Sequence, residues 1–197
     1  MANLNYPSTE LYQLPKKNVL VISCIDLRLT DNLLHFLHHD NLTNRYDHIA
    51  LAGTSLCTCA DSHAEDFCES NLKQYKQFKH WNETLEDHLE IAITLHHIKD
   101  VYIIEHEDCG AYKQFLKNGD FSTKAKEWKQ HQIFAKELAN KINAKSYHDK
   151  KKRKNGDENE DVQEKYNLNV HCFMIDLRGN IDLLYTTKKP KLGGKKY

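Results

Sequence analysis

The sequence predicts an α/β fold with a mostly parallel central sheet of four strands, a short C-terminal edge strand and flanking helices. Two long apolar runs, over residues 18–24 and from residue 101 onward, are rich in Val, Ile and Leu and suit central strands that are covered on both faces. The segments between them carry apolar residues at helical spacing. Alternation of strands and helices is typical of a parallel sheet with right-handed crossovers.

Each further element follows from a local pattern. Apolar residues at helical spacing predict three helices, and short apolar runs predict the remaining strands. In chain order we expect a strand over 18–24, a helix over 31–39, a strand over 47–52, a helix over 82–98, a strand from 101, a helix over 123–146, a strand over 168–176 and a short edge strand over 181–185. Gly53 is expected to turn the backbone sharply after the second strand.

Three stretches lack such patterns. Residues 1–17 are polar and contain two prolines, and we expect an arm that lies over the surface or over a partner subunit. Residues 54–80 are mostly polar, and we interpret them as an insertion. Residues 148–165 have too few apolar residues to offset the entropy of ordering, so we expect a mobile loop. We interpret residues 1–197 as one domain, because this length suits a single core.

Charge and hydropathy argue against several classes of partner. Lys plus Arg and Asp plus Glu both number 28, so no net field favours nucleic acid or an anionic membrane. No apolar run approaches the roughly 18 residues that span a bilayer, and the first residues lack the regions of a signal peptide. Six cysteines are too sparse for a secreted disulfide scaffold. We therefore expect a cytoplasmic protein with reduced thiols.

Both long apolar runs end in chemically reactive residues. Cys24 follows the first run, and His106 and Cys109 follow the second. Parallel sheets bind ligands at the carboxyl ends of their strands. Two thiolates and one imidazole are a known ligand set of catalytic zinc sites, in which the fourth position is left to water or substrate. The sequence therefore predicts a zinc site formed by Cys24, His106 and Cys109.

The motif C-x-D-x-R at residues 24–28, together with H-x-x-C-G at 106–110, resembles the zinc signature of the β-class carbonic anhydrases. Residues 49–53 resemble the Ala-Gly loop of that family and residues 170–179 its closing strand and turn, so the similarity covers nearly the whole chain. The resemblance implies reversible hydration of carbon dioxide to bicarbonate by zinc-bound hydroxide. It also implies a homodimer or higher homo-oligomer, because the family's pocket forms between subunits.

Asp26 and Arg28 are the candidate catalytic residues. They are two positions apart, so in an extended stretch they lie on the same side as Cys24 and can form a charge-assisted pair near the metal. The resemblance implies two roles for Asp26, which either orients the zinc-bound water or becomes a fourth ligand that displaces it. An ordinary salt bridge at a strand end is the other interpretation. Because Arg stays charged and can grip a carboxylate with two hydrogen bonds, we predict that Arg28 holds Asp26 off the metal.

The sequence also departs from the family pattern. Glu105 and Glu107 flank the zinc histidine, where the family usually has glycine and a small hydroxyl residue, and residues 50–51 replace an Arg-Asn pair. Carboxylates that face the pocket would disfavour an anion or compete for Arg28, whereas carboxylates that face away would be structural. An altered pocket favours the alternative function: a catalytically silent or substrate-shifted zinc-binding member of the fold, such as a carbonyl sulfide or carbon disulfide hydrolase.

Three further cysteines leave several interpretations open. Cys57, Cys59 and Cys68 are an incomplete tetrahedral set, which His63 would complete as a second metal site. A redox pair is another interpretation, and free thiols in a loop are the favoured one. A nucleotide-binding domain is excluded, because no glycine-rich loop follows the first strand.

Overall fold

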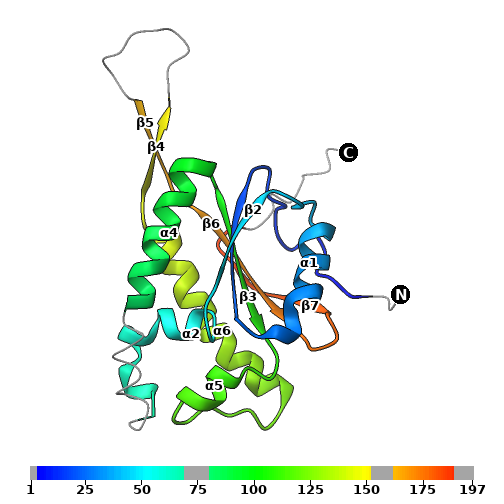
Figure 1. The fold of residues 1–197 in the computed structure, drawn as a ribbon. Helices are drawn as coiled ribbons and strands as arrows, with labels where there is room; N and C mark the ends of the chain where they lie inside the picture. Colours follow the sequence, from blue (N-terminus) through cyan, green and yellow to red (C-terminus); the bar gives the residue numbers. More distant parts are fainter. Residues whose placement is uncertain (1–3, 69–79, 152–161, 189–197) are drawn as a thin grey trace, which may run out of the picture.

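The computed structural model describes residues 4–68, 80–151 and 162–188 (Figure 1). Its central sheet has five strands in the order β2-β1-β3-β6-β7. The strands are β1 (Val19–Ser23), β2 (Tyr46–Ala50), β3 (Asp100–His106), β6 (Asn169–Ile175) and β7 (Ile181–Thr186). All neighbours pair in parallel except β7, which runs antiparallel to β6. The predicted fold class, with its four parallel strands and C-terminal edge strand, is confirmed.

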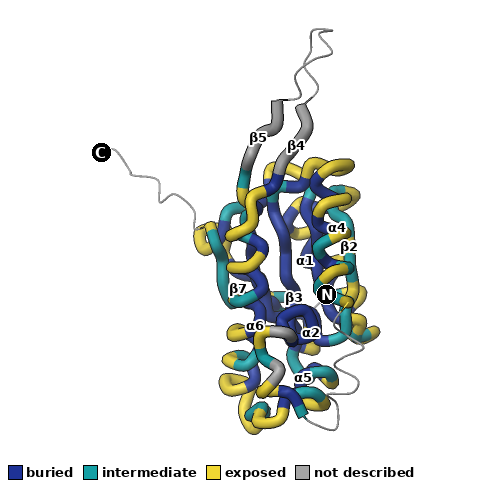
Figure 2. Tube along the Cα trace, turned by 90° about the vertical axis from the view of Figure 1, so that its left-hand side faces the viewer, coloured by how far each residue is buried: buried dark blue, intermediate teal, exposed yellow. Residues whose placement is uncertain are grey.

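The burial of the two apolar runs explains their central position. All five residues of β1 and all seven of β3 are buried, and Figure 2 shows β3 running buried through the middle of the molecule. In the parallel register, Ser23 lies beside Ile104. Cys24 comes directly after β1, and His106 is the last residue of β3. The two side chains therefore lie at neighbouring strand ends.

Helices cover both faces of the sheet (Figure 1). On one face lies α1 (Thr30–His39), whose Phe36 stacks on Tyr102 of β3 with ring centroids 6.1 Å apart. On the other face lies α6 (Lys124–Ala144), which contacts β3, β6 and β7. α4 (His80–His96) packs beside α6. Side chains along β3 therefore point alternately toward the α1 layer and the α6 layer.

Two helical faces differ in detail from the prediction. Leu34 in α1 and Ile133 in α6 belong to the apolar residues at helical spacing that predict these two helices, yet they are 47% and 45% exposed. In α6 two polar residues, Glu127 and His131, are buried instead. Oε1 of Glu127 accepts from the N–H of Asp108, and Nδ1 of His131 bonds to Glu105; such hydrogen bonds lower the cost of burying a polar group. Among the described residues, Nε2 of His131 has no partner.

The expected insertion over 54–80 contains ordered elements. Its first residues form the short helix α2 (Ser55–Thr58), all of which is buried, followed by the 3-10 turns η2 (Ala60–Ser62) and η3 (Ala64–Asp66). α2 packs against α4 and α6. Residues 69–79 lie outside the described residues. The polar composition concealed α2 because its hydroxyl groups are buried with partners in the fold.

The stretch over 148–165, where we expected a mobile loop, has a strand at each end. β4 (Tyr147–Lys151) and β5 (Val162–Tyr166) pair antiparallel and form a separate two-stranded sheet. Backbone hydrogen bonds between two strands need no continuous apolar face, so the low apolar content gave no sign of them. The central residues of that stretch, 152–161, lie outside the described residues, as does the basic tail from residue 189.

The N-terminal arm lies over its own domain, which was one of the two predicted positions. Tyr12 is fully buried, and its hydroxyl donates to both carboxylate oxygens of Asp40 at 2.9 and 2.8 Å. The N–H of Ile181 donates to the carbonyl oxygen of Asn5 at 2.8 Å. The arm therefore needs no partner subunit to be ordered.

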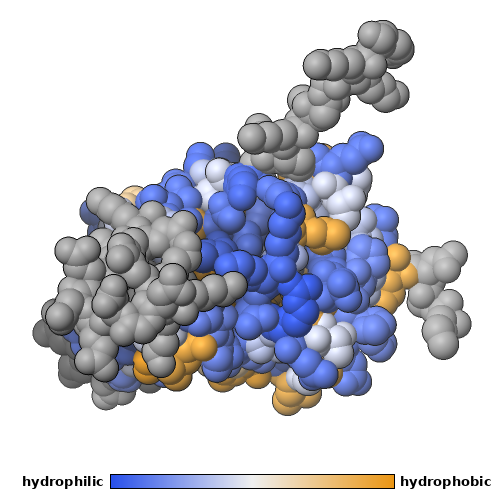
Figure 3. Space-filling view, turned by 90° about the horizontal axis from the view of Figure 1, so that it is seen from above, coloured by the Kyte–Doolittle hydropathy of each residue, from blue (hydrophilic) through white to orange (hydrophobic). Residues whose placement is uncertain are grey.

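One end of the molecule has a largely polar surface. Hydrophilic residues cover most of the end of the molecule that lies opposite to the carboxyl ends of the parallel strands (Figure 3). In the part of the chain that the structure describes, no helix combines the length and the apolar composition needed to traverse a bilayer.

Candidate metal centre

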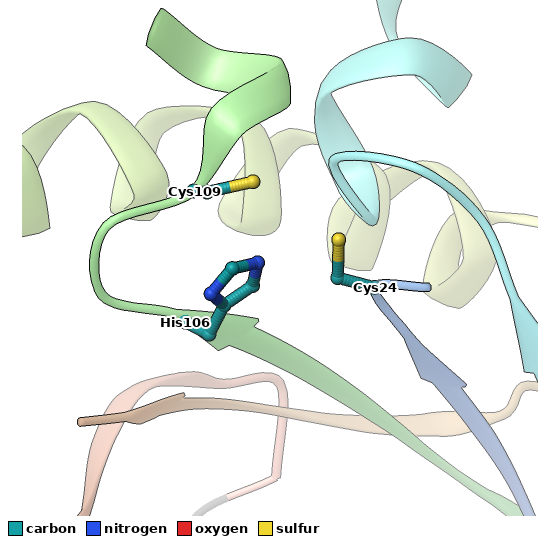
Figure 4. Close-up of side chains that lie close together, drawn as sticks. All are labelled: Cys24, His106 and Cys109. Atoms are coloured by element: carbon teal, nitrogen blue, oxygen red, sulfur yellow. The ribbon is translucent and has the colours of Figure 1, made fainter. Parts of the chain in front are cut away.

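The three predicted zinc ligands come together at the carboxyl ends of β1 and β3 (Figure 4). Cys24 directly follows β1, His106 is the last residue of β3, and Cys109 precedes α5 (Gly110–Phe115). Their ligand atoms all lie within 4.8 Å of one another, and all three residues are buried. Over residues 4–68, 80–151 and 162–188 no other group of His, Cys, Asp and Glu has this geometry. The group can therefore hold a metal ion.

His106 presents one nitrogen to this group and anchors the other. Its Nδ1 donates to the carbonyl oxygen of Glu107 at 2.9 Å. In the neutral imidazole Nε2 is then the unprotonated nitrogen, and it is buried without a hydrogen-bond partner. Histidines that bind metals normally donate their second N–H to a carbonyl or carboxylate oxygen, and buried polar atoms normally have a partner. A metal ion satisfies both rules here.

The two thiols differ in pKa. Hydrogen-bond donation from the Cys109 thiol is the largest influence that holds the pKa of Cys24 well below its ordinary value, and the N–H of Gly53, 3.4 Å from Cys24 Sγ, adds to it. The same interaction and burial raise the pKa of Cys109. Cys24 is therefore a thiolate at neutral pH, the form that binds metals.

Gly53 turns the backbone beside Cys24, as predicted. Its φ is +72°, a conformation that glycine adopts readily. A Cβ at this position would lie 3.0 Å from the Cβ of Ala111. Both the turn and the close approach to α5 therefore require glycine.

Arg28 and Asp26 form the predicted pair. Nε of Arg28 donates to Oδ1 of Asp26 at 2.9 Å and Nη2 donates to Oδ2 at 2.7 Å. These hydrogen bonds are the largest cause that lowers the pKa of Asp26 to about 2. Oδ2 lies 4.0 Å from His106 Nε2. The carboxylate thus borders the position of the metal and is held by Arg28.

Asp108 also contacts Arg28, and the sequence did not predict this. Its Oδ2 accepts from Nη1 of Arg28 at 2.8 Å, its carbonyl oxygen accepts from Nη2 at 3.1 Å, and Oδ1 pairs with Lys113. Asp108 has a positive φ of 62°. No sequence signal identifies this contact, because 80 residues separate Asp108 from Arg28.

Neither glutamate beside His106 contacts Arg28. Glu105 is fully buried and bonds to Ser55 and His131. Glu107 is half-buried and accepts from the N–H of Leu177 at 3.4 Å. Among the described contacts, neither carboxylate therefore competes with Asp26 for Arg28, although the sequence allowed this. The position of Glu105 near the end of an apolar strand was a sequence signal, because a buried carboxylate needs hydrogen-bond donors around it.

The additional cysteines form neither of the predicted clusters. All six cysteines are free, so Cys57, Cys59 and Cys68 form no disulfide. Cys57 and Cys59 are buried, and Cys59 Sγ lies 3.7 Å from the carbonyl oxygen of Phe134. The imidazole of His63, the proposed fourth ligand, is paired with two carboxylates, those of Asp66 and Glu137. The free-thiol interpretation holds, although two of these thiols lie in the interior rather than in a loop.

A pocket of about 150 Å³ opens beside Cys24 and Asp26, between β1, β2 and α1. Most of its lining is apolar, and Leu29, Leu33 and Leu34 contribute to it. One polar pair borders it, Ser23 Oγ and His48 Nε2 at 2.7 Å. The pocket can therefore admit a small apolar molecule next to the candidate metal ligands.

Comparison with known proteins supplies no activity. No protein-family model matches the chain. A protein of Rickettsia bellii is 29% identical over 176 residues, which cover 89% of this chain and 86% of that protein. A protein of Rickettsia conorii is 27% identical over 176 residues, with 89% of this chain and 76% of that protein covered. Both are named only as uncharacterized proteins.

Proposed function

We propose that the protein is a zinc-dependent enzyme that reversibly hydrates carbon dioxide to bicarbonate, related to the β-class carbonic anhydrases that its motifs resemble. The observation that carries the proposal is the buried Nε2 of His106, which has no hydrogen-bond partner and lies within 4.8 Å of the sulfurs of Cys24 and Cys109. One histidine and two cysteines with an open fourth position are typical of catalytic zinc.

Zinc bound there would supply a nucleophile, because catalytic zinc lowers the pKa of water from 15.7 toward about 7. Asp26 then has the role of a hydrogen-bond acceptor that orients the nucleophile. Its pKa of about 2 means that it stays ionised at neutral pH and does not retain a proton. Arg28 and Asp108 fix its direction. The apolar pocket beside Cys24 suits carbon dioxide, which is itself apolar.

We also propose that the smallest stable unit is a homodimer and that it works in the cytoplasm, where thiols stay reduced. Three large apolar side chains near the pocket support the dimer. Ile25, Leu27 and Leu34 are 65%, 86% and 47% exposed. Apolar groups gathered in this way mark interaction surfaces. A second copy of the chain would cover them and close the pocket, which Ile25 and Leu34 line.

The test combines metal analysis with stopped-flow carbon dioxide hydration on one purified sample. We expect bound zinc and hydration that is lost on treatment with a chelator and restored by added zinc. A zinc-loaded protein that leaves the hydration rate at the buffer value would contradict the proposed reaction. The same sample would then be assayed with carbonyl sulfide and carbon disulfide, which separates a substrate-shifted enzyme from a silent zinc protein.

A further inference from the structure

A fully buried carboxylate lies directly before the candidate zinc ligand His106. Oε1 of Glu105 accepts from the N–H of Ser55 at 3.1 Å and from the Ser55 hydroxyl, and Oε2 accepts from Nδ1 of His131 at 2.8 Å. Glu105 and both partners are buried. One side chain thus ties β3 to α2 and to α6, with a donor on each side. Buried carboxylates that lose a donor pay the full cost of their desolvation.

The loop before α2 has a backbone conformation that must be held. Thr54 has φ 47° and ψ −104°, and a positive φ is an outlier for a β-branched residue. Such conformations persist only where the surrounding structure fixes them. Two contacts with β3 fix this one, in addition to the hydrogen bond from the N–H of Thr54 to the carbonyl oxygen of Leu51 at 2.9 Å. The hydroxyl of Thr54 donates to the carbonyl oxygen of Ile104 at 3.2 Å, and Ser55 donates to Glu105.

The same loop contacts a candidate metal ligand. The residue before Thr54 is Gly53, whose N–H lies 3.4 Å from Cys24 Sγ. If Ser55 is released from Glu105, Thr54 can relax toward an ordinary φ. Gly53 directly precedes Thr54 and its backbone rotates easily, so this movement can also turn the Gly53 N–H away from the sulfur. The hydrogen bond on the Cys24 thiolate therefore depends on an anchor two residues further along the chain.

We infer that Glu105 is a positioning residue of the metal centre, which acts by clamping residues 53–55 and so directing the Gly53 N–H at Cys24 Sγ. The inference rests on the proposed metal centre. It assigns a purpose to a carboxylate that occupies a position where the resembled family usually has glycine. His131 has the supporting role of fixing the second oxygen of Glu105.

Glu105→Gln tests the clamp with almost no change in shape. A glutamine amide has one oxygen and one NH2 group, so it cannot accept from both Ser55 and His131. One donor meets another donor unless His131 moves its proton from Nδ1 to Nε2, which is buried without a hydrogen-bond partner. Either arrangement weakens the hydrogen bonds that hold residue 105 between Ser55 and His131. The matched control is Tyr102→Phe, at the opposite end of the same strand. This substitution removes the 2.7 Å hydrogen bond that the Tyr102 hydroxyl donates to Asp40. Asp40 is also a buried carboxylate, but among the described residues its hydrogen bonds do not reach residues 53–55.

Three readouts separate positioning from general stability. Zinc affinity is measured by competition with a chromophoric chelator, the thiolate-to-metal absorption band is recorded with Co²⁺ in place of zinc, and amide hydrogen exchange of residues 53–55 is followed in the metal-free chain. For Glu105→Gln we expect a loss of about 10–100-fold in zinc affinity, the range for residues that support metal ligands. We also expect a shifted Co²⁺ band and faster exchange. Tyr102→Phe should match the parent in all three.

Two further variants complete the test. One weakens the clamp less severely, in case Glu105→Gln does not fold, and the other removes the backbone strain at Thr54. Ser55→Ala removes the hydroxyl bond to Glu105 and a 3.2 Å contact with the Tyr112 hydroxyl, and it keeps the N–H bond to Glu105. It should therefore change the three readouts in the same direction but less. Thr54→Gly removes the strain together with the hydroxyl bond to Ile104. Combined with Glu105→Gln it should restore part of the zinc affinity, because glycine adopts this backbone conformation without strain.

The outcomes distinguish this inference from the proposed metal centre. A parent chain that takes up no zinc would overturn both. A parent that binds zinc while Glu105→Gln binds it equally tightly, with the same Co²⁺ band, would overturn the positioning role alone. An equal loss of affinity in Tyr102→Phe would also overturn it, since the effect would then come from stability. If Glu105→Gln does not fold, parent-like readouts in Ser55→Ala would have the same meaning.

Discussion

Arg28 grips the carboxylate of Asp26 through two parallel hydrogen bonds, at 2.9 Å from Nε and 2.7 Å from Nη2. Charge-assisted pairs of this kind are geometrically specific as well as strong. The remaining donor of the guanidinium, Nη1, bonds to Asp108, so the side chain is fixed from two directions. Asp26 therefore has one orientation beside the candidate metal ligands.

Arg28→Ala should keep its zinc and lose most of its hydration activity. Without the pair, the Asp26 carboxylate, whose Oδ2 lies 4.0 Å from Nε2 of His106, is free to move onto the metal. Misplacement of a group at the reacting centre costs about 100-fold in rate. Asp108→Asn should have a smaller effect, because its carbonyl oxygen still accepts from Arg28. Hydration by Arg28→Ala at the parent rate would leave only an ordinary salt bridge at a strand end.

The same pair predicts an acid titration. The pKa of Asp26 is lowered to about 2, chiefly by its hydrogen bonds to Arg28. The stabilisation that the pair provides is therefore fully present above the ordinary aspartate pKa and is lost as the pH falls through about 2. Carboxylate ¹³C NMR should place the Asp26 transition near that pH in the parent and near the ordinary value in Arg28→Ala. Titration of the parent near pH 4 would show that Arg28 does not hold the carboxylate.

The ligand set and the strands could be predicted from the sequence because each depends on a local pattern. An apolar run followed by Cys24, and another followed by His106, is visible without any structure. Asp108 and the Glu105 cluster could not be predicted, because their partners are 26 to 80 residues distant. The pairing of β4 with β5 was missed for a different reason. It depends on backbone hydrogen bonds, which side-chain composition does not report.

Leu27→Asp should yield a monomer if the apolar surface beside the pocket joins two copies. Leu27 is 86% exposed, and a carboxylate there would be buried without a partner in the dimer. Sedimentation velocity across a range of concentrations measures the change. Leu95→Asp is the control, since Leu95 is 65% exposed on α4 and should leave the dimer intact. A parent that sediments as a monomer at every concentration would rule out the dimer.

Tyr12→Phe should lower the free energy of unfolding by about 1.5–3 kcal/mol, the range for hydrogen bonds to charged groups. Its hydroxyl donates to both oxygens of Asp40, and both residues are buried. Urea denaturation gives the value. Tyr185→Phe, whose hydroxyl bonds to Asn140 at the surface, should stay within about 0.5 kcal/mol of the parent. A loss in Tyr12→Phe no larger than in this control would mean that the N-terminal arm contributes little stability.

The most direct test of the metal centre is the zinc content of native protein by mass spectrometry, for the parent, Cys24→Ser and Cys68→Ser. Cys24 is a candidate ligand, and Cys68 is a free thiol outside the group. We expect one zinc per chain in the parent and in Cys68→Ser, and none in Cys24→Ser. Equal zinc in all three proteins, or no zinc in the parent, would contradict the assignment of Cys24 as a ligand.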